Sequence, residues 1–547
     1  MRLRHLAFLA ALAVAPAAAQ ESAPAPTPAP ASPQLVVAIS VDQLSSDLFE
    51  QYRPHYTGGL ARLLSGAAFP SGFQSHAATE TCPGHSTILT GVHPARNGII
   101  ANDWMAKDKT GKLVEVYCAE DEANKPASGQ GYTPSAVHLL VPTLGDRVKA
   151  RWPGSKNVAV SGKDRGALMM AGGNADTIYF RWGSGFGTVA GKQLGLEAQA
   201  LNAEVKTLLT EGAPAIKAPA WCEARDRAIP LGNFSVGAGR FELKPGDFAG
   251  FSRSPRYDEV TVELAKRLID GEKLGADGEP DVLSVSLSAT DYVGHAYGTN
   301  GIESCIQVAE LDRMLGELFD ALDAKGIDYV AMLTADHGGI DLPERASEQG
   351  VPAARRVDAS FVPAIMGKAL GEVLRIKGPV FAGGSPAGDV WFDTALSAKD
   401  RARVTAAVRA KVAKSDDVAA VFTAAELAAA PAPSGDPRTW TLVQRAKASY
   451  YPGRSGDLVM LLAPAVQPVP EPRPGIVATH GSPWDYDRRV PILFWRKGMA
   501  QVEQPFPIET VDVAPTLAAI LGLTAESGAF DGRCLDLDSG PGSTCER

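Results

Sequence analysis

The sequence of 547 residues lacks several features that mark whole protein classes. After the first 19 residues it has no apolar run of the roughly 20 residues that a bilayer-spanning helix needs. Acidic residues outnumber basic ones by 62 to 53, which argues against a nucleic-acid binder working through a basic surface. It shows no internal repeat and no coiled-coil heptads. These absences predict a soluble protein without a membrane span, and a monomer is favoured.

The N-terminus has the pattern of a cleavable secretory signal. Arg2 and Arg4 precede a short apolar run, and small residues follow up to position 19. We therefore expect residues 1–19 to be a signal peptide and the protein to be periplasmic or extracellular. Residues 20–33, rich in Ala and Pro, predict an extended linker before a catalytic domain over residues 34–547. Removal of residues 1–19 takes away two arginines and no acid, which leaves 51 basic and 62 acidic residues and a net charge of −11.

Cysteine is scarce, and no two of the six cysteines have zinc-finger spacing. In an exported chain, an even number is compatible with three disulfides, although sequence alone does not fix their pairing. Cys534 and Cys545 would close an easy short loop. The remaining pairs are then guesses, and we take them as Cys82 with Cys118 and Cys222 with Cys305.

Residues 78–87, Ala-Thr-Glu-Thr-Cys-Pro-Gly-His-Ser-Thr, place the hydroxyl of Thr81 directly before a predicted helix. Proline is favoured in the first turn of a helix, and the N-terminus of a helix presents unpaired N–H groups that attract anions. We therefore predict that Thr81 is a nucleophile at the binding site of an anionic ester. Cys82 is the alternative nucleophile, although an oxidising compartment favours its pairing in a disulfide.

Three apolar, β-branched runs predict strands buried on both faces of a parallel sheet, namely residues 34–41, 281–288 and 329–334. Polar side chains follow each run: Asp42, then Asp291 and His295, then Asp336 and His337. Ligands of open α/β sheets bind beyond the carboxyl ends of the strands, so these side chains are candidate ligands. Taken alone, Asp42 is equally compatible with a turn or a helix cap.

Residues 303–324 carry a helical apolar stripe between two of these strands. The order strand, helix, strand predicts a βαβ unit, and with it an α/β fold whose central, mostly parallel sheet is flanked by helices. Residues 103–258 are less regular and predict an inserted cap region that covers the site. Ala-rich residues 400–414 and 419–430 predict helices, and proline-rich residues 466–475 predict a loop.

The chain has only nine histidines, yet three of them join three carboxylates as candidate ligands: Asp42, Asp291, His295, Asp336, His337 and His480. Mixed nitrogen and oxygen ligands suit zinc, and two ions about 4 Å apart can hold the attacking and leaving oxygens of an in-line displacement. The spacing of Asp291 and His295 can direct both side chains at one ion. Each motif alone is weak, since an Asp-His-Gly turn arises by chance and a lone His480 is more often a surface residue.

In their order along the chain, these motifs and the Thr81 stretch resemble the two-zinc core of the alkaline phosphatase superfamily. Residues 510–517 also resemble its C-terminal helix. The resemblance implies that Asp42, Asp336, His337 and Thr81 hold one Zn²⁺, and that Asp291, His295 and His480 hold the other. It implies further that Thr81 attacks phosphorus and forms a phosphothreonine that water hydrolyses, because a metal ion lowers the pKa of a hydroxyl.

Asn102, Lys163 and Arg165 resemble the phosphoryl-binding set of the threonine-nucleophile bacterial alkaline phosphatases, typified by the Sphingomonas type. A monoester dianion carries more charge than a diester, and Arg can bind two of its oxygens. The alternative for Lys163 and Arg165 is a solvated charged turn. The expected function is thus a secreted, zinc-dependent alkaline phosphatase acting on small phosphate monoesters.

Two other functions stay open, namely a nucleotide pyrophosphatase or phosphodiesterase of the same superfamily and a zinc-binding protein without turnover. A serine hydrolase is disfavoured, because Ile88 replaces the last glycine of the G-x-S-x-G motif. The sulfatase motif, which needs Cys or Ser, one residue, Pro, one residue and then Arg, is absent at Cys82-Pro83. The third metal of the enterobacterial and mammalian alkaline phosphatases is not expected.

Overall fold

The computed structural model describes residues 32–126, 131–538 and 542–546. The predicted signal peptide and nearly all of the predicted linker lie outside these residues. Within the described ranges, no helix is both long and apolar enough to cross a bilayer.

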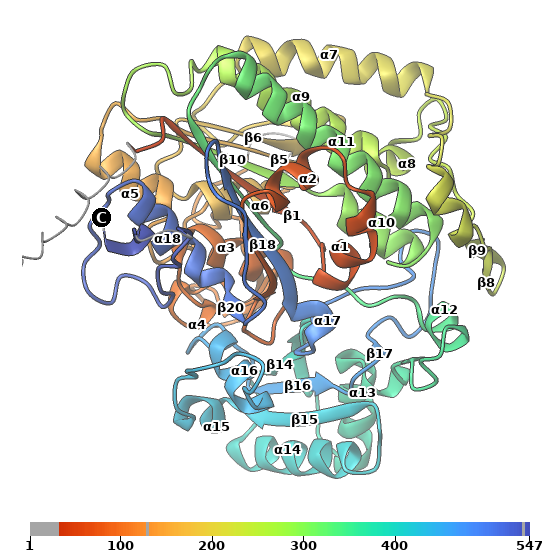
Figure 1. Ribbon diagram of the computed structural model, residues 1–547. Coiled ribbons are helices and arrows are strands. Elements are labelled where there is room, and N and C mark those ends of the chain that lie inside the picture. The colour runs from red at the N-terminus through yellow and green to blue at the C-terminus, as the bar shows by residue number, and fades with distance from the viewer. Residues whose placement is uncertain (1–31, 127–130, 539–541, 547) are drawn as a thin grey trace, which may run out of the picture. The chain divides into compact units, whose positions relative to one another are not determined.

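A mixed sheet of ten strands forms the centre of the fold (Figure 1). Its order is β19-β2-β18-β11-β1-β10-β5-β6-β7, and β20 pairs with β2. The strands span Leu35–Val41 (β1), Ala67–Phe73 (β2), Asn157–Ser161 (β5), Thr177–Trp182 (β6), Gly185–Gly187 (β7), Asp281–Leu287 (β10), Tyr329–Thr334 (β11), Arg489–Arg496 (β18), Val502–Glu503 (β19) and Ile508–Glu509 (β20). The neighbours β11, β1, β10, β5 and β6 run parallel, whereas β18 and β7 are antiparallel to their neighbours. The predicted α/β fold with a mostly parallel sheet is confirmed.

Helices cover both faces of this sheet (Figure 1). Side chains alternate along a strand, so Leu35, Val37 and Ile39 of β1 join one buried core and Val36 and Ala38 join another. The first core includes helices α9 (Pro255–Gly271) and α11 (Ile302–Ala324). The second includes α3 (Thr81–Thr90), α5 (Leu144–Arg151) and α18 (Val513–Ile520). Strand β1 is therefore apolar along nearly its whole length because both of its faces are buried.

The expectation that residues 103–258 form an inserted cap is wrong for much of that range. Strand β5 pairs in parallel with β10, β6 pairs with β5, and α9 packs on the sheet. Strands β5 and β6 have only five and six residues, which is too short for a clear strand pattern in the sequence. The first part of the range does lie outside the central sheet, as the hairpin of β3 (Asp103–Lys107) and β4 (Leu113–Tyr117).

A second sheet of four strands, which sequence reasoning missed, has the order β13-β14-β16-β15. Its strands are Phe381–Gly384 (β13), Asp389–Phe392 (β14), Leu458–Leu462 (β16) and Val418–Thr423 (β15). Helices α13 (Pro363–Leu374) and α14 (Ala398–Val412) share its apolar core. The predicted helix over 419–430 is wrong in its first half, because Val421 and Phe422 pair with β16 and this pairing overrides alanine's helix propensity. Only Ala424–Ala429 (α15) is helical there.

Several further elements position the site. They are α6 (Asp164–Ala171), α10 (Ala289–Tyr297), α17 (Asp485–Arg488) and the short strand β17 (Val466–Gln467), which begins the otherwise irregular loop predicted over 466–475. Three disulfides join Cys82 to Cys118, Cys222 to Cys305 and Cys534 to Cys545, which confirms the pairing taken from the sequence.

Candidate active site

The candidate site lies at the carboxyl ends of four neighbouring parallel strands. Strand register pairs Ser40 with Ser286 and Thr334, and it pairs Ser286 with Ser161. The residues that follow these positions therefore emerge side by side: Asp42 after β1, Lys163 after β5, Asp291 after β10 and Asp336 after β11. All four are buried. The sequence prediction that strand-end residues gather at one edge is thus what the topology produces.

Thr81 is the first residue of α3, and its side chain is buried. Within the described part of the chain, its Oγ1 has no hydrogen-bond partner. The helix approaches the end of β11 closely, since a Cβ on Gly84 would lie 2.0 Å from the carbonyl oxygen of Asp336. Glycine in the first turn therefore lets the start of α3, which carries Thr81, pack against Asp336, and a larger residue there would push the helix away.

Three histidines are held in one orientation by backbone carbonyl groups. Nδ1 of His295 lies 2.8 Å from the oxygen of Ala478, and Nδ1 of His480 lies 2.8 Å from the oxygen of Thr79. His337 makes the same kind of contact to Gly338 at 2.9 Å. A donor at Nδ1 leaves the Nε2 lone pair available as a ligand, which is the arrangement that metal-binding histidines use.

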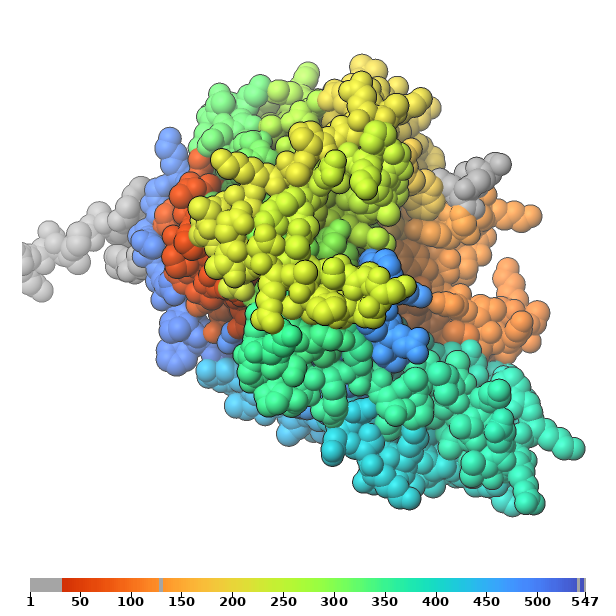
Figure 2. Space-filling model, turned by 90° about the vertical axis from the view of Figure 1, so that its right-hand side faces the viewer, coloured from red at the N-terminus to blue at the C-terminus, as the bar shows by residue number. Residues whose placement is uncertain are grey.

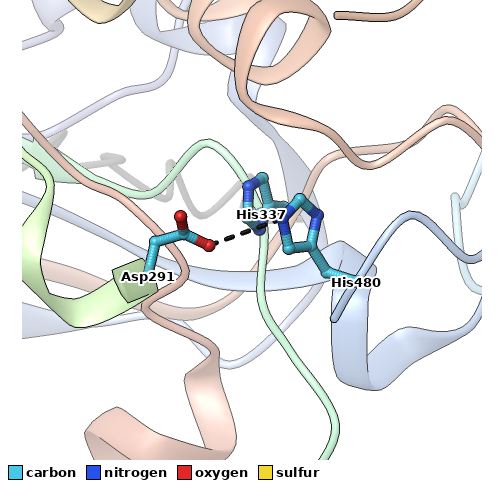
Figure 3. A group of neighbouring side chains, drawn as sticks. All are labelled: Asp291, His337 and His480. Atoms are coloured by element: carbon cyan, nitrogen blue, oxygen red, sulfur yellow. Dashed lines mark ion pairs between the residues drawn. The ribbon is translucent and has the colours of Figure 1, made fainter. Parts of the chain in front are cut away.

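The Nε2 atoms point at the carboxylates. His295 Nε2 lies 3.1 Å and His480 Nε2 lies 3.4 Å from Oδ1 of Asp291, while His337 Nε2 lies 3.4 Å from Oδ1 of Asp42. Figure 3 shows Asp291 facing His480, whose ring stacks on that of His337 with 3.6 Å between the ring centroids. Two groups bring one ligand atom per residue within 4.8 Å of one another: Asp42, Asp336 and His337, and Asp291, His337 and His480.

The first group contains the three protein side chains assigned to one ion besides Thr81. The second shares Asp291 and His480 with the other predicted set, and His337 lies in both groups. His295 contacts Asp291 from α10, four residues further along the same helix. The structure therefore brings all six predicted ligands into one cluster, with His337 between the two groups.

The buried carboxylates of this cluster repel one another, and a bound cation would offset that repulsion. Burial, reinforced by Asp336, raises the pKa of Asp42 well above its usual range. For Asp291, burial acts in the opposite direction, but His295 and Lys163 hold its pKa well below the usual range. Burial lowers the pKa of His337 to about 3, so this imidazole is neutral at pH 7. A neutral imidazole and neighbouring carboxylates are the forms in which these groups bind metals.

The donor set fits the binding of divalent metal ions. Asp42 Oδ1, Asp336 Oδ2 and His337 Nε2 are buried and accept no well-aligned hydrogen bond from the described residues. Unsatisfied buried acceptors are costly unless a ligand pairs with them. Carboxylate oxygens with imidazole nitrogens are a donor set that zinc accepts.

Lys163 lies between the two halves of the cluster. Its Nζ is 2.5 Å from Oδ2 of Asp42 and 2.6 Å from Oδ2 of Asp291, and its side chain is buried. The ammonium also lies 4.9 Å from the centre of the Tyr292 ring. The alternative of a solvated charged turn is therefore wrong for Lys163, because its charge is paired inside the protein.

Asn102 lies next to the start of α3, which carries Thr81, and Arg165 lies on α6. The Asn102 Oδ1 accepts a hydrogen bond from the backbone N–H of Cys82 at 2.9 Å, and the backbone N–H of Asn102 donates to Oε2 of Glu80 at 2.7 Å. The amide is thus fixed beside Thr81. Arg165, on α6, lies 3.4 Å from the hydroxyl of Tyr117, which itself donates to Asp164.

Sequence reasoning missed three residues that support the site. Asp258 is fully buried on α9, and its Oδ1 accepts from the backbone N–H groups of Ser288 and Ala289, where α10 begins. It therefore fixes the helix that carries Asp291 and His295. His85 lies 3.0 Å from Asp336, and Glu80 holds Asn102. For His85 and Glu80 the signal was their place in the Thr81 stretch, whereas nothing local marks Asp258.

Comparison with known proteins gives concordant matches. The family model described as type I phosphodiesterase / nucleotide pyrophosphatase matches residues 36–483. Alkaline phosphatase PhoK from Sphingomonas sp is 49% identical over 517 residues, which cover 94% of this chain and 92% of PhoK.

Solved structures agree. The wild-type alkaline phosphatase PafA has a TM-score of 0.80 and 26% identity, covering 93% of this chain and 99% of that one. A PafA variant with a threonine, an asparagine, a lysine and an arginine substituted gives a TM-score of 0.79 and 25% identity over the same shares.

Proposed function

Because the chain belongs to the type I phosphodiesterase / nucleotide pyrophosphatase family, we propose that it is a phosphate monoester hydrolase of the alkaline phosphatase kind that acts through Thr81. The observation that carries this proposal is the position of Thr81, whose hydroxyl is buried at the start of α3 beside Asn102, on the helix whose Gly84 packs against Asp336 of the ligand cluster. The name of the 49% identical relative supports the same activity.

The proposed reaction has two displacements. The Thr81 oxygen forms a bond to phosphorus while the ester P–O bond breaks, the hydroxyl proton leaves, and the leaving alkoxide takes up a proton to depart as the alcohol. Water then attacks the phosphothreonine, phosphate leaves, and the Thr81 hydroxyl is restored. Asn102, fixed by the N–H of Cys82, orients the phosphoryl group through its amide.

Two zinc ions complete the proposed site. Asp42, Asp336 and His337 with Thr81 would hold one, and Asp291, His295 and His480 would hold the other. Bound there, the ions supply activation of a hydroxyl at neutral pH and neutralisation of the charge on the transferring group. The backbone carbonyls that accept from the three Nδ1 atoms preset the histidines for this role.

A preference for monoesters follows from the cations. A monoester dianion needs more positive charge than a diester, and Lys163 and Arg165 both stand at the β5–α6 junction, where Lys163 contacts Asp42 of the ligand cluster. The PafA variant described above is altered at the same four residue types as Thr81, Asn102, Lys163 and Arg165. We also propose that the protein is exported, since its N-terminus carries a signal pattern and its cysteines pair in disulfides.

The family description also names phosphodiesterases, so the test compares both ester types. The full chain is assayed with an aryl phosphate monoester and the matching diester, before and after chelation and again after zinc is restored. We expect a strong monoester preference that chelation abolishes and zinc restores. Arg165→Ala should lower monoester kcat/KM about tenfold or more and leave the diester rate much less affected. A preference for the diester would move the protein to the phosphodiesterases, and chelator-resistant turnover would contradict the zinc assignment.

A further inference from the structure

An apolar cavity of about 570 Å³ adjoins the candidate active site. Its walls come from the end of α8 (Phe248–Ser252), from α10, from the second sheet and from the loop after β17. Six of its apolar lining residues are Phe361, Val390, Met460, Leu462, Val469 and Ile476. In Figure 2 the blue loop of residues around 470–480 lies between the yellow-green part of the chain and the teal part that begins the second sheet.

The cavity shares residues with the site. Tyr292 and His295 line it, and so does Thr479, the neighbour of His480. Tyr292 is the residue whose ring lies beside the Lys163 ammonium, and His295 contacts Asp291. The cavity therefore begins where the set of Asp291, His295 and His480 ends. This is the ligand set that does not include Thr81, and an in-line displacement places the leaving oxygen on the side of phosphorus away from the nucleophile.

The walls of the cavity are largely apolar and carry little charge. None of the lining residues is acidic, and Arg253 is the one permanently charged side chain among them. Val390 and Met460 lie on paired strands of the second sheet and belong to its core, so this wall is formed before any ligand binds. A preformed, largely apolar cavity of 300–1,000 Å³ with few polar groups is the usual form of a small-molecule site.

Resting on the proposed function, we infer that this cavity binds the leaving group of the phosphate monoester, and that the preferred leaving group has an apolar aryl or branched alkyl body. A quaternary ammonium leaving group finds no carboxylate in the lining and meets Arg253 instead. The site thus selects esters of apolar alcohols and phenols over phosphocholine or methyl phosphate. Selectivity resides in the contact of this body with the cavity, not in the phosphoryl site.

The first test measures kcat/KM for two series, in which the alkanols have nearly equal acidity, as do the phenols, while choline is the more acidic alcohol and so would react faster if acidity alone decided. One series compares methyl, butyl and 3-methylbutyl phosphate with phosphocholine, and the other compares phenyl with 2-naphthyl phosphate. We expect kcat/KM to rise about three- to fourfold for each buried methylene, with phosphocholine lowest. Monoester turnover without any dependence on the leaving group would overturn this inference alone, whereas absence of monoester turnover would overturn the proposed function.

The second test measures binding without turnover. Fluorescence titration of the purified protein with 2-naphthol, which carries no phosphoryl group and cannot be turned over, should show saturable binding. Ile476→Ser, which removes apolar wall, and Val469→Trp, which fills the cavity, should each weaken that binding about tenfold. Ile376→Ser makes the same chemical change at a half-buried site lining a different cavity and should leave binding as in the parent. The inference would be contradicted if all three variants weakened 2-naphthol binding equally, or if none of them weakened it.

The same variants separate the cavity from the phosphoryl site. Methyl phosphate turnover, which does not use the cavity, should stay within about twofold of the parent in Ile476→Ser, while 2-naphthyl phosphate turnover falls about tenfold. An equal loss for both substrates would show that the loop acts through the site itself.

Discussion

The ammonium of Lys163 lies 2.6 Å from the carboxylate of Asp291, so a residue predicted to bind substrate is in direct contact with one predicted to bind metal. The same ammonium lies 2.5 Å from Asp42, which directly follows the neighbouring strand β1. Lys163 thus links the two halves of the ligand cluster and counters the repulsion among buried carboxylates. Its pairing is part of the stability of the site as well as of its chemistry.

Lys163→Met tests this link. Breaking a buried charge pair by removing one partner costs about 3–5 kcal/mol. We expect the free energy of unfolding of the chelator-treated protein to fall by about 3 kcal/mol, and zinc to reduce the difference because it neutralises the same carboxylates. Urea unfolding with and without zinc measures both quantities.

The matched control is Lys149→Met, which removes a partly exposed ion pair to Asp176. It should cost no more than about 1 kcal/mol in either metal state. If Lys163→Met lost no more free energy of unfolding than the control, and zinc did not change that loss, then Lys163 would not balance the ligand carboxylates.

Metal content tests the assignment of the ligand sets. We expect the purified protein to hold about two zinc ions per chain and His480→Ala to hold about one, because one ligand set loses an imidazole while the other keeps Asp42, Asp336 and His337. Elemental analysis after dialysis gives the ratio. His55→Ala removes an exposed histidine stacked on Trp221 and should leave two. One ion per chain in the parent, or an unchanged ratio in His480→Ala, would refute the assignment.

Stability should depend on pH through Asp258. Burial raises the pKa of Asp258 to about 7 from an ordinary 3.8. The folded state then binds this proton more tightly than the unfolded state, so the free energy of unfolding falls as pH rises from about 4 to about 7. Asp258→Asn, whose amide cannot ionise, should remove about 2 kcal/mol of the fall between pH 5 and pH 8.

Urea unfolding of the chelator-treated protein at the two pH values measures this effect without metal linkage. Asp320→Asn, at an exposed carboxylate, is the control and should keep the parent's pH dependence. If Asp258→Asn also keeps it, Asp258 is not the group responsible.

The parts of the fold that could be predicted are those whose signal is local. The apolar run that forms β1 needs both faces covered, and its end at Asp42 marks the edge where ligands gather. Strands β5 and β6 were not predicted because each is short. Only the pairing of β5 with β10 and of β6 with β5 makes them part of the sheet. Strand β15 was predicted as a helix because its alanines favour one, and its pairing with β16 overrides that preference.

The candidate site divides in the same way. His295 and Asp291 share a helix, so their spacing was informative, and His480 was recognisable only beside the other motifs. The capping of α10 by Asp258 joins positions 30 and 31 residues apart, and no periodicity or motif reports such a contact. The cavity beside His295 depends on the second sheet, which sequence reasoning did not find.

The most direct test of the account is the turnover of a phosphate monoester by Thr81→Ala, measured on protein whose zinc content equals that of the parent, with Thr81→Ser as the matched control. We predict that kcat/KM falls at least about a thousandfold in Thr81→Ala, because no oxygen remains to attack phosphorus, and that Thr81→Ser keeps a measurable part of the activity. A Thr81→Ala protein with full zinc and turnover within about tenfold of the parent would contradict Thr81 as the nucleophile.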